Sequence, residues 1–261
     1  MSVEYRLEEH IAVAILNRPD RLNAVDQSLS EGLVAAVRRA GSEAGALVVT
    51  GAGKAFCSGA DLSDLMADYE KGDPDLARLI EVRFHPMAAA LVECPVPTIA
   101  AVNGAAAGAG LGLALSCDLR LMSETAFFSS AFTGIGLVPD SGSTWWLPHH
   151  IGLGRAMEIV MSNRRVEAEE AMRLGLTSRV VPGDQLFDES LRWAGELAAG
   201  ATEALVATRH LLHNAAGSHL AAAWDAERET QGRLGRTPEH LEGVRAFTEK
   251  RSPDFRGAST P

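Results

Sequence analysis

Two turns built from small residues constrain the fold of this chain more than any other feature. The first occupies residues 50–62 (TGAGKAFCSGADL) after the apolar run Leu47–Val49, and the second occupies residues 103–112 (NGAAAGAGLG) after residues 98–102 (TIAAV). Each pattern predicts a buried strand, a tight turn and the start of a helix. This succession is the repeating unit of α/β proteins, so we expect that fold class.

The chemistry of such turns is that of backbone N–H groups. Small residues leave these groups uncovered, and the following helix adds unpaired N–H groups and the positive end of its dipole. Two turns of this kind facing each other would form an oxyanion hole made of backbone alone. An oxyanion hole suits a reaction that develops negative charge on a carbonyl oxygen.

Nucleotide binding is the alternative explanation of the two turns, and neither turn fits it. A Walker-type loop needs Ser or Thr after its Lys, whereas Lys54 is followed by Ala55. In the second turn, Leu113 stands where a dinucleotide-binding fingerprint needs its third Gly. Glycine-rich turns are also common in α/β proteins without any catalytic role.

Composition limits the possible partners and the compartment. The 261 residues predict one domain, or one domain with a small appendage, around a large core. A net charge of −10 argues against nucleic acid and against anionic membrane surfaces as partners. The odd number of cysteines, without metal-ligand spacing, favours a reducing compartment. No apolar signal segment begins the sequence, so we expect a cytoplasmic protein.

One uncharged run, from Cys94 to Cys117, is long enough to span a bilayer. Pro95, Pro97 and Asn103 interrupt it, and Ala and Gly dominate its second half. A buried strand, a turn and a helix therefore explain the run better than a membrane span.

Apolar periodicity predicts alternating strands and helices in the first part of the chain and helices alone in the last part. We therefore expect an α/β core over residues 1–190 and a C-terminal helical region over residues 191–261. The expected strands are 13–16, 47–50, 98–102, 119–122, 126–129 and 179–181. The expected helices are one between the cap Asp26 and Gly41, and then 75–93, 155–161, 167–174, 185–199, 203–214, 219–234 and 238–249.

Four further motifs, taken with the two turns, resemble the crotonase superfamily of enoyl-CoA hydratases and isomerases. They are residues 16–24 (LNRPDRLNA), Cys117-Asp118, residues 136–140 (GLVPD) and residues 247–255 (FTEKRSPDF). The resemblance covers nearly the whole chain. It implies the ClpP/crotonase fold, a spiral of repeated ββα units followed by a helical region. It also implies that this region assembles the chain into a homotrimer, often paired into a hexamer.

The resemblance assigns the oxyanion hole to the backbone N–H groups of Ala60 and Ala109. The alternative is that both alanines only allow helices to pack closely. Hydratases that resemble this chain carry two glutamates that hold and polarise water. Those positions fall at Gly112 and Phe132, which cannot do acid–base work. Hydration by the usual two-carboxylate route is therefore not expected.

Asp140 is the remaining carboxylate. Its surroundings, residues 136–144 (GLVPDSGST), resemble the isomerase branches, and most closely the ring-epoxide isomerases of phenylacetyl-CoA breakdown, where an acidic residue after this Pro moves a proton between carbons. A helix N-cap is the alternative role. A pocket formed by Phe132, Leu137 and Trp145 would raise the pKa of Asp140 and suit it to carry a proton.

The resemblance also implies that the acyl group is carried by coenzyme A, as part of the substrate and not as a separate cofactor. No metal or redox cofactor is implied, and the eight histidines form no metal motif. The expected coenzyme A contacts are Arg21, Asn23 and Ala24 at the entrance, the backbone of Ser58, Ala60 and Leu62 against the adenine with Asp61 among them, and Phe247 and Lys250 on the last long helix. A solvated helix end is the alternative reading of Lys250.

The sequence thus favours an acyl-CoA isomerase that shifts a double bond, or opens a ring, through a thioester enolate, with Asp140 as acid and base. An enoyl-CoA hydratase with a single carboxylate is one alternative. An acyl-CoA-binding protein without chemistry is the other.

Overall fold

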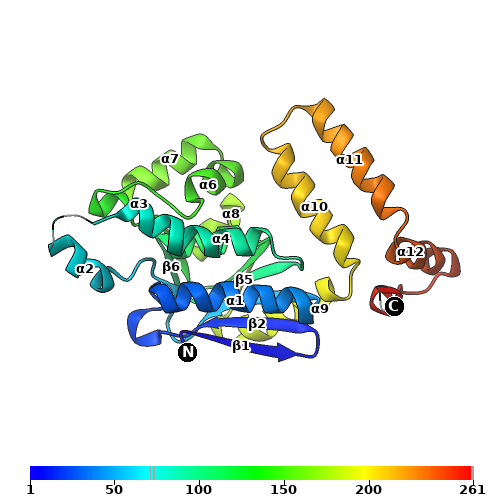
Figure 1. Cartoon of the computed structure of the whole chain (residues 1–261), viewed down its shortest axis with the longest axis horizontal. Helices are drawn as coiled ribbons and strands as arrows, with labels where there is room; N and C mark the ends of the chain where they lie inside the picture. Colours follow the sequence, from blue (N-terminus) through cyan, green and yellow to red (C-terminus); the bar gives the residue numbers. More distant parts are fainter. Residues whose placement is uncertain (71, 73, 260–261) are drawn as a thin grey trace.

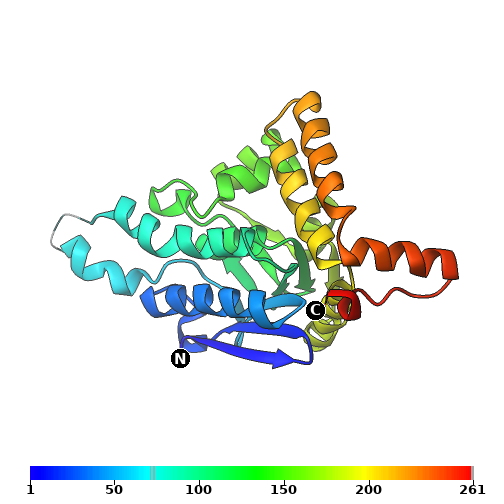
Figure 2. The same ribbon diagram turned by 45° about the vertical axis from the view of Figure 1, so that its right-hand side comes forward.

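The computed structural model describes every residue of the chain except 71, 73, 260 and 261. Figure 1 shows an α/β body from which a helical arm extends. The arm consists of α10 (Thr202–Ala215), α11 (Leu220–Leu234), α12 (Pro238–Glu249) and α13 (Phe255–Ser259). Figure 2 shows the same arm from another side, still projecting from the body.

Two sheets form the centre of the body. The larger has the order β1-β2-β3-β5-β7-β10, and its pairs are parallel except for the hairpin β1–β2. The smaller has the order β4-β6-β8-β9, with only β8–β9 antiparallel. The strands of the larger sheet are β1 (Val3–Glu8), β2 (Ile11–Leu16), β3 (Ala46–Gly51), β5 (Thr98–Val102), β7 (Leu119–Ser123) and β10 (Arg179–Val181). Those of the smaller are β4 (Ala55–Cys57), β6 (Ala105–Ala107), β8 (Phe127–Ser129) and β9 (Arg165–Glu167).

Consecutive strands alternate between the sheets, and this alternation makes the spiral. In each of the pairs β3–β4, β5–β6 and β7–β8, the first strand joins the larger sheet and the second joins the smaller one. The helices of the body are α1 (Gln27–Glu43), α2 (Leu62–Glu70), α3 (Leu76–Leu79), α4 (His85–Val92), α5 (Ala109–Ser116), α6 (Ser143–Ile151), α7 (Leu153–Ser162), α8 (Ala168–Leu174) and α9 (Leu186–Ala198). The repeated ββα architecture expected from the sequence is confirmed.

All six expected strands are present, but the sequence missed four others. β4, β6 and β9 have three residues each, too few to show a period-two pattern. β1 is an edge strand with mostly polar residues, VEYRLE, so its apolar signal is weak. The run from Cys94 to Cys117 is folded as β5, β6 and the buried helix α5. Among the described helices, none is long and apolar enough to cross a bilayer.

Helix α1 shows how local signals and packing combine. The Asp26 side chain accepts a hydrogen bond from the Leu29 N–H at 2.8 Å, so the expected N-cap is confirmed. The helix continues to Glu43, past the end expected at Gly41. A Cβ at Gly41 would lie 2.4 Å from Pro95 Cγ, so this glycine is explained by close packing and not by helix termination.

The expected helix over 75–93 is one continuous rod with a π-helical turn, Ile80–Phe84, between α3 and α4. Its extra residue per turn shifts the helix phase, and such turns are frequent at functional sites. Leu76, Leu79, Ile80 and Phe84 share one side of this rod, as their spacing predicted.

Helix α9 belongs to the body and not to the arm. Its buried residues Leu186, Ala194 and Ala198 form a second core cluster with Val48 and Ile99, on the face of the larger sheet away from the main core. The boundary expected at residue 190 therefore falls inside α9. The arm itself is attached to the body by Arg209 of α10, whose guanidinium pairs with Asp118 at 2.6 Å.

Candidate active site

A largely apolar cavity of about 350 Å³ lies where the two small-residue turns meet. Residues 58–60 of the first turn and Gly108 and Ala109 of the second form one wall. The rod of α3, the π-helical turn and the segment 131–140 contribute most of the rest. Two junctions that are about fifty residues apart in the sequence therefore share one site, as the sequence predicted.

The close approach of the turns depends on glycine. Gly59 has φ +95°, and a Cβ there would lie 3.0 Å from the Ala107 carbonyl oxygen and 3.4 Å from the Ala109 nitrogen. Gly108 has φ +55°, and a Cβ there would lie 3.6 Å from Gly59 Cα. The backbone of Ala60 is thereby brought next to the start of α5.

The N–H groups of Ala60 and Ala109 take no part in the backbone hydrogen bonds that hold the two turns. Val25 donates to the Gly59 carbonyl at 2.7 Å, and Asp61 donates to the Val25 carbonyl at 3.1 Å. Gly108 donates to the Ser129 carbonyl at 3.0 Å. Within the described residues, neither alanine N–H has a protein acceptor. Two free donors at one cavity wall, one of them at a helix N-terminus, can stabilise an oxyanion.

Asp140 lies on the same cavity and is partly buried. Its Oδ1 accepts a hydrogen bond from the Ser141 hydroxyl at 2.8 Å. Burial raises the pKa of Asp140 above its ordinary value, while the Ser141 hydrogen bond and the charge of His85 act in the opposite direction. A carboxylate whose pKa is raised in this way is suited to accept and return a proton.

One expectation about the surroundings of Asp140 is wrong, and the alternative role of Asp140 as an N-cap is excluded. Phe132 and Leu137 line its cavity, but Trp145 lies in a separate groove, stacked on His149 with ring centroids 4.0 Å apart. Asp140 is also not an N-cap, because α6 begins at Ser143 after Gly142, and the Asp140 side chain caps no N–H of that helix. Its main-chain carbonyl accepts from Ser143 instead.

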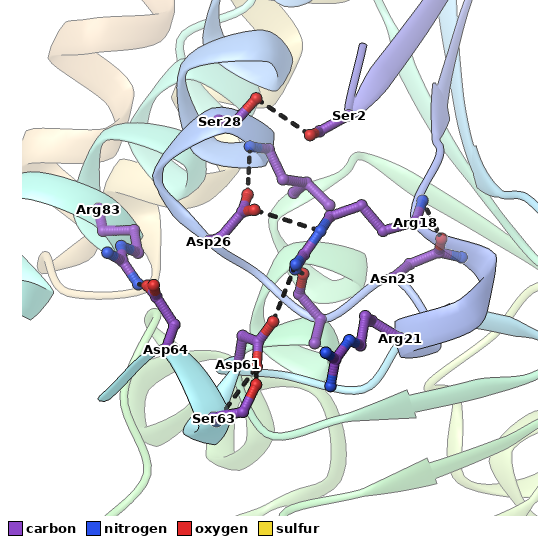
Figure 3. Close-up of polar contacts among 12 residues, drawn as sticks. Ser2, Arg18, Arg21, Asn23, Asp26, Ser28, Asp61, Ser63, Asp64 and Arg83 are labelled. Carbon is purple, nitrogen blue, oxygen red and sulfur yellow. Dashed lines mark hydrogen bonds and ion pairs between the residues drawn. The ribbon is translucent and has the colours of Figure 1, made fainter. Parts of the chain in front are cut away.

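Arg18 braces the loop that carries Ala60 (Figure 3). Its guanidinium pairs with Asp61 at 2.9 Å and with Asp26 at 3.2 Å, and it also donates to the Ala24 carbonyl. The hydrogen bonds from Ser63 and then from Arg18 lower the pKa of Asp61, although burial opposes them. The brace joins the end of β2, the start of α1 and the oxyanion loop.

A second ion pair in Figure 3 joins two other walls of the cavity. Arg83, in the π-helical turn, pairs with Asp64 of α2 at 2.9 Å. Leu62 and Tyr69 of α2 line the same cavity as Ile80 and Phe84. Together with Leu76 and Leu79, these residues make α2 and the rod part of the cavity wall.

The comparison with protein families decides what this arrangement is. The model described as enoyl-CoA hydratase/isomerase matches residues 6–258. The chain belongs to this family. It is therefore a member of the crotonase superfamily, as its motifs suggested.

Curated relatives of this crotonase-family chain carry both kinds of name. A probable enoyl-CoA hydratase of Rhodobacter capsulatus is 42% identical over 257 residues, which cover 98% of each chain. The 1,2-epoxyphenylacetyl-CoA isomerase of Escherichia coli K12 is 36% identical over 253 residues, covering 96% of this chain and 97% of that protein. The names leave hydratase and isomerase chemistry open.

Solved structures agree with the fold. An enoyl-CoA hydratase of Polaromonas sp. JS666 superposes with a TM-score of 0.91 at 32% identity, covering 96% of this chain and 98% of that one. Enoyl-CoA hydratase subunit I of Geobacillus kaustophilus gives 0.89 at 35% identity, covering 97% of each chain.

The cavity of this family member holds few acid–base groups. Asp140 is the one carboxylate among the described residues that line it. Phe132 lines it as an apolar wall, and Gly112 is buried in α5 without a side chain. No group of three or more His, Cys, Asp or Glu side chains in the described part of the chain could hold a metal.

Position 112 has no room for a side chain, which gives a stability prediction. A Cβ there would lie 2.5 Å from Ser141 Cβ and 2.6 Å from the Ser141 carbonyl oxygen. We expect Gly112→Ala to lower the free energy of unfolding by about 1–3 kcal/mol, measured by urea denaturation, and Gly112→Glu to lower it further. Adding glutamate at 112 is therefore a poor way to create a hydratase.

Gly154→Ala is the matched control. Gly154 lies in α7 with no atom within 4 Å of its added Cβ, so this change should be neutral or stabilising. If the Gly112→Ala variant were as stable as the unmodified protein, the segment around Ser141 would have to move aside without cost. That result would contradict the prediction.

The expected coenzyme A contacts divide into three groups. Ser58 and Leu62 line the cavity, and Arg21 lies next to Ser58, whose hydroxyl donates to the Arg21 carbonyl at 3.4 Å. Asn23 and Asp61 are buried, and their side chains are already bonded within the protein, so neither side chain is free to contact coenzyme A.

Asn23 is a structural residue of the first loop. Its side chain accepts from Arg18 N–H at 2.8 Å and donates to the carbonyls of Ala52 and Ala55 at 2.9 and 2.7 Å. Its φ of +57° also suits an asparagine in a tight turn. The neighbouring Ala24 is buried, and its carbonyl is occupied by Arg18.

Phe247 and Lys250 are not brought to this cavity within one chain. Figures 1 and 2 show α12 on the arm, far from α2 and α3. Phe247 is 86% exposed, and Lys250 ends α12 with φ +55°. A contact with coenzyme A from these residues would need a second chain.

Sequence reasoning missed Arg18 and Ser141. Arg18 lies inside the quoted motif of residues 16–24, but its pairing with Asp26 and Asp61 depends on the fold and has no sequence signal. Ser141 directly follows the candidate base. Its side-chain direction depends on a left-handed backbone with φ +51°, which could not be predicted from the sequence.

Proposed function

We propose that this chain is an acyl-CoA isomerase that works through a thioester enolate. The observation that carries the proposal is the composition of one cavity. It holds two free backbone donors, Ala60 and Ala109, and a single carboxylate, Asp140. A single proton carrier beside an oxyanion hole is sufficient to move a double bond.

The proposed reaction needs one proton and no other reactant. With a 3-enoyl thioester, ionised Asp140 takes the proton from C2, and the electron pair moves onto the thioester oxygen held by the Ala60 and Ala109 N–H groups. Protonated Asp140 then delivers the proton to C4 as the double bond forms between C2 and C3. One donor of an oxyanion hole contributes about 10²–10³ in rate. Ring opening is an alternative outcome of the same enolate.

The cavity wall supports isomerisation over water addition. Phe132, Ile135, Leu137 and Val138 present apolar atoms near Asp140, and no second carboxylate among the described lining residues could orient water. Hydration remains the second candidate, because the Rhodobacter capsulatus relative is named a probable hydratase. An acyl-CoA-binding protein without turnover is the third.

The identity of the product tests the proposal. A 3-enoyl-CoA should give a product of unchanged mass with its double bond at C2, detected by ultraviolet absorbance and mass spectrometry. A product heavier by one water would favour the hydratase. Recovery of the substrate despite measurable binding would favour the binding protein.

Coenzyme A belongs to this proposal as part of the substrate, without a metal or redox cofactor. Its proposed contacts are Ser58 and Leu62, which line the cavity, and Arg21, whose carbonyl accepts a hydrogen bond from Ser58. The three cysteines are buried, and burial raises the pKa of Cys57 and of Cys117 to about 12, which supports unreactive thiols in a cytoplasmic protein.

We also propose that the arm assembles the chain into a trimer or hexamer. Leu212, Trp224 and Phe247 are 67%, 61% and 86% exposed on α10, α11 and α12, which is unusual for large apolar side chains in a monomer. Assembly would also provide the second chain that Phe247 and Lys250 need to reach a coenzyme A. A stable monomer in analytical ultracentrifugation would contradict this.

A further inference from the structure

The turn that carries Asp140 has an unusual backbone. Ser141 and Gly142 have φ of +51° and +80°, so two consecutive residues are left-handed. A positive φ is uncommon for a residue other than glycine and calls for a structural reason. Ser141 is also only 1% exposed, so its hydroxyl is directed into the protein and not into solvent.

The position of Ser141 is enforced by α5. Its Cβ lies 2.5 Å from where a Gly112 side chain would begin, so the serine fills the space that the glycine leaves. Gly112 and Ser141 therefore act as one packed unit. Because α5 starts at Ala109, the same helix supplies an oxyanion donor and holds the serine beside the base.

The Ser141 hydroxyl is committed to one oxygen of Asp140. It donates to Oδ1 at 2.8 Å, and Oδ2 accepts no hydrogen bond within the part of the chain that the structure describes. One oxygen is thus anchored while the other is left for a substrate proton. Besides this hydroxyl, the charge of His85, at the start of α4, also acts on Asp140.

We propose that Ser141 is the positioning residue of Asp140, holding one carboxylate oxygen in place and favouring the ionised form that accepts the substrate proton. The proposal rests on the proposed function of Asp140. A hydrogen bond to the charged form favours that form, so its loss must make Asp140 harder to ionise. Burial and His85 stay unchanged when only the hydroxyl is removed.

The test is the pH dependence of kcat/KM for isomerisation of a 3-enoyl-CoA by Ser141→Ala. Alanine keeps the Cβ that packs on Gly112 and has the same difficulty with positive φ, so only the hydroxyl is lost. We expect the midpoint of the rising limb to move up by about one pH unit. A hydrogen bond to a charged group contributes at least about 1.4 kcal/mol, which corresponds to a pKa shift of about one unit. Activity should fall about tenfold below the midpoint and recover at high pH.

Ser143→Ala is the matched control. Ser143 is fully buried two residues away, and its hydroxyl has no partner among the described residues, so its pH profile should match that of the unmodified protein. Ser141→Gly is a second variant without the hydroxyl that also relaxes the backbone, and it should show the same shift if Ser141→Ala folds poorly.

The outcomes separate this inference from the proposed function. A uniform loss of activity at all pH values, with an unmoved midpoint in both Ser141 variants, would overturn the positioning role. Asp140→Asn is measured beside them. If Asp140→Asn retains its turnover, the proposed function fails as well. If that variant is inactive and the midpoint does not move, only the role of Ser141 is lost.

Discussion

Asp140→Asn is expected to lower kcat for isomerisation of a 3-enoyl-CoA by about 10²–10⁴ while leaving the binding of acyl-CoA nearly unchanged. The amide keeps the shape of the carboxylate and can still accept from the Ser141 hydroxyl, but it cannot take a proton. Asp140 is the one carboxylate on the described cavity wall, so no neighbour can replace it. Steady-state kinetics and isothermal titration with a non-reacting acyl-CoA would measure the two effects.

Stability should distinguish this loss from unfolding. Burial raises the pKa of Asp140 in the folded protein, so the ionised side chain opposes folding at pH values above its unfolded pKa. That penalty disappears as the pH falls and the group is protonated. The asparagine variant should therefore be at least as stable as the unmodified protein at neutral pH. Asp188→Asn, which removes an exposed carboxylate from the first turn of α9, is the charge control and should leave kcat unchanged and lower the free energy of unfolding by less than about 1 kcal/mol.

Near-normal turnover by Asp140→Asn would show that another group carries the proton. His85 would then be the first residue to examine, because it is the titratable group whose charge acts on this position.

Arg209→Met is expected to lower the free energy of unfolding by about 3–5 kcal/mol, the usual cost of removing one partner of a buried ion pair. Arg209 is 6% exposed, contacts both oxygens of Asp118 and donates to the carbonyls of Val92, Cys94 and Val96. Its loss leaves these acceptors without their donor and detaches α10 from the body. Chemical denaturation at a fixed protomer concentration would measure the effect.

Arg233→Met is the control for this prediction. Arg233 of α11 pairs with Glu203 of α10 at 2.9 Å, but both side chains are more than half exposed, so the change should cost less than about 1 kcal/mol. Equal losses from the two variants would contradict the view that Arg209 anchors the arm.

Much of this fold could be predicted from sequence because its signals are local. The runs that form β3 and β5 are continuously apolar, which is typical of strands covered on both faces, and each is followed by a turn of small residues. The two turns then had to meet, because the carboxyl ends of parallel strands lie at the same edge of a sheet. The family resemblance placed Ala60 and Ala109 together, and the parallel pairing of β3 and β5 explains why they meet.

The parts that failed depend on contacts between distant residues. Asn23 and Asp61 are among the expected coenzyme A contacts, but their side chains are bonded within the protein. Their burial follows from partners such as Arg18, which is 43 residues from Asp61 in sequence. Trp145 was placed in the wrong pocket because the left-handed turn at Ser141 and Gly142 sets the direction in which α6 leaves the active site.

The most direct test of the account compares two reactions of the same unmodified protein. Isomerisation of a 3-enoyl-CoA and hydration of crotonyl-CoA should be measured side by side as kcat/KM. Hydration needs a group that holds and deprotonates water, and the apolar wall at Phe132 and the bare Gly112 provide none. Because a positioned general acid–base contributes at least about 10², isomerisation should exceed hydration by at least that factor. Comparable values for the two substrates would contradict a single-carboxylate isomerase and would show that another group activates water in this cavity.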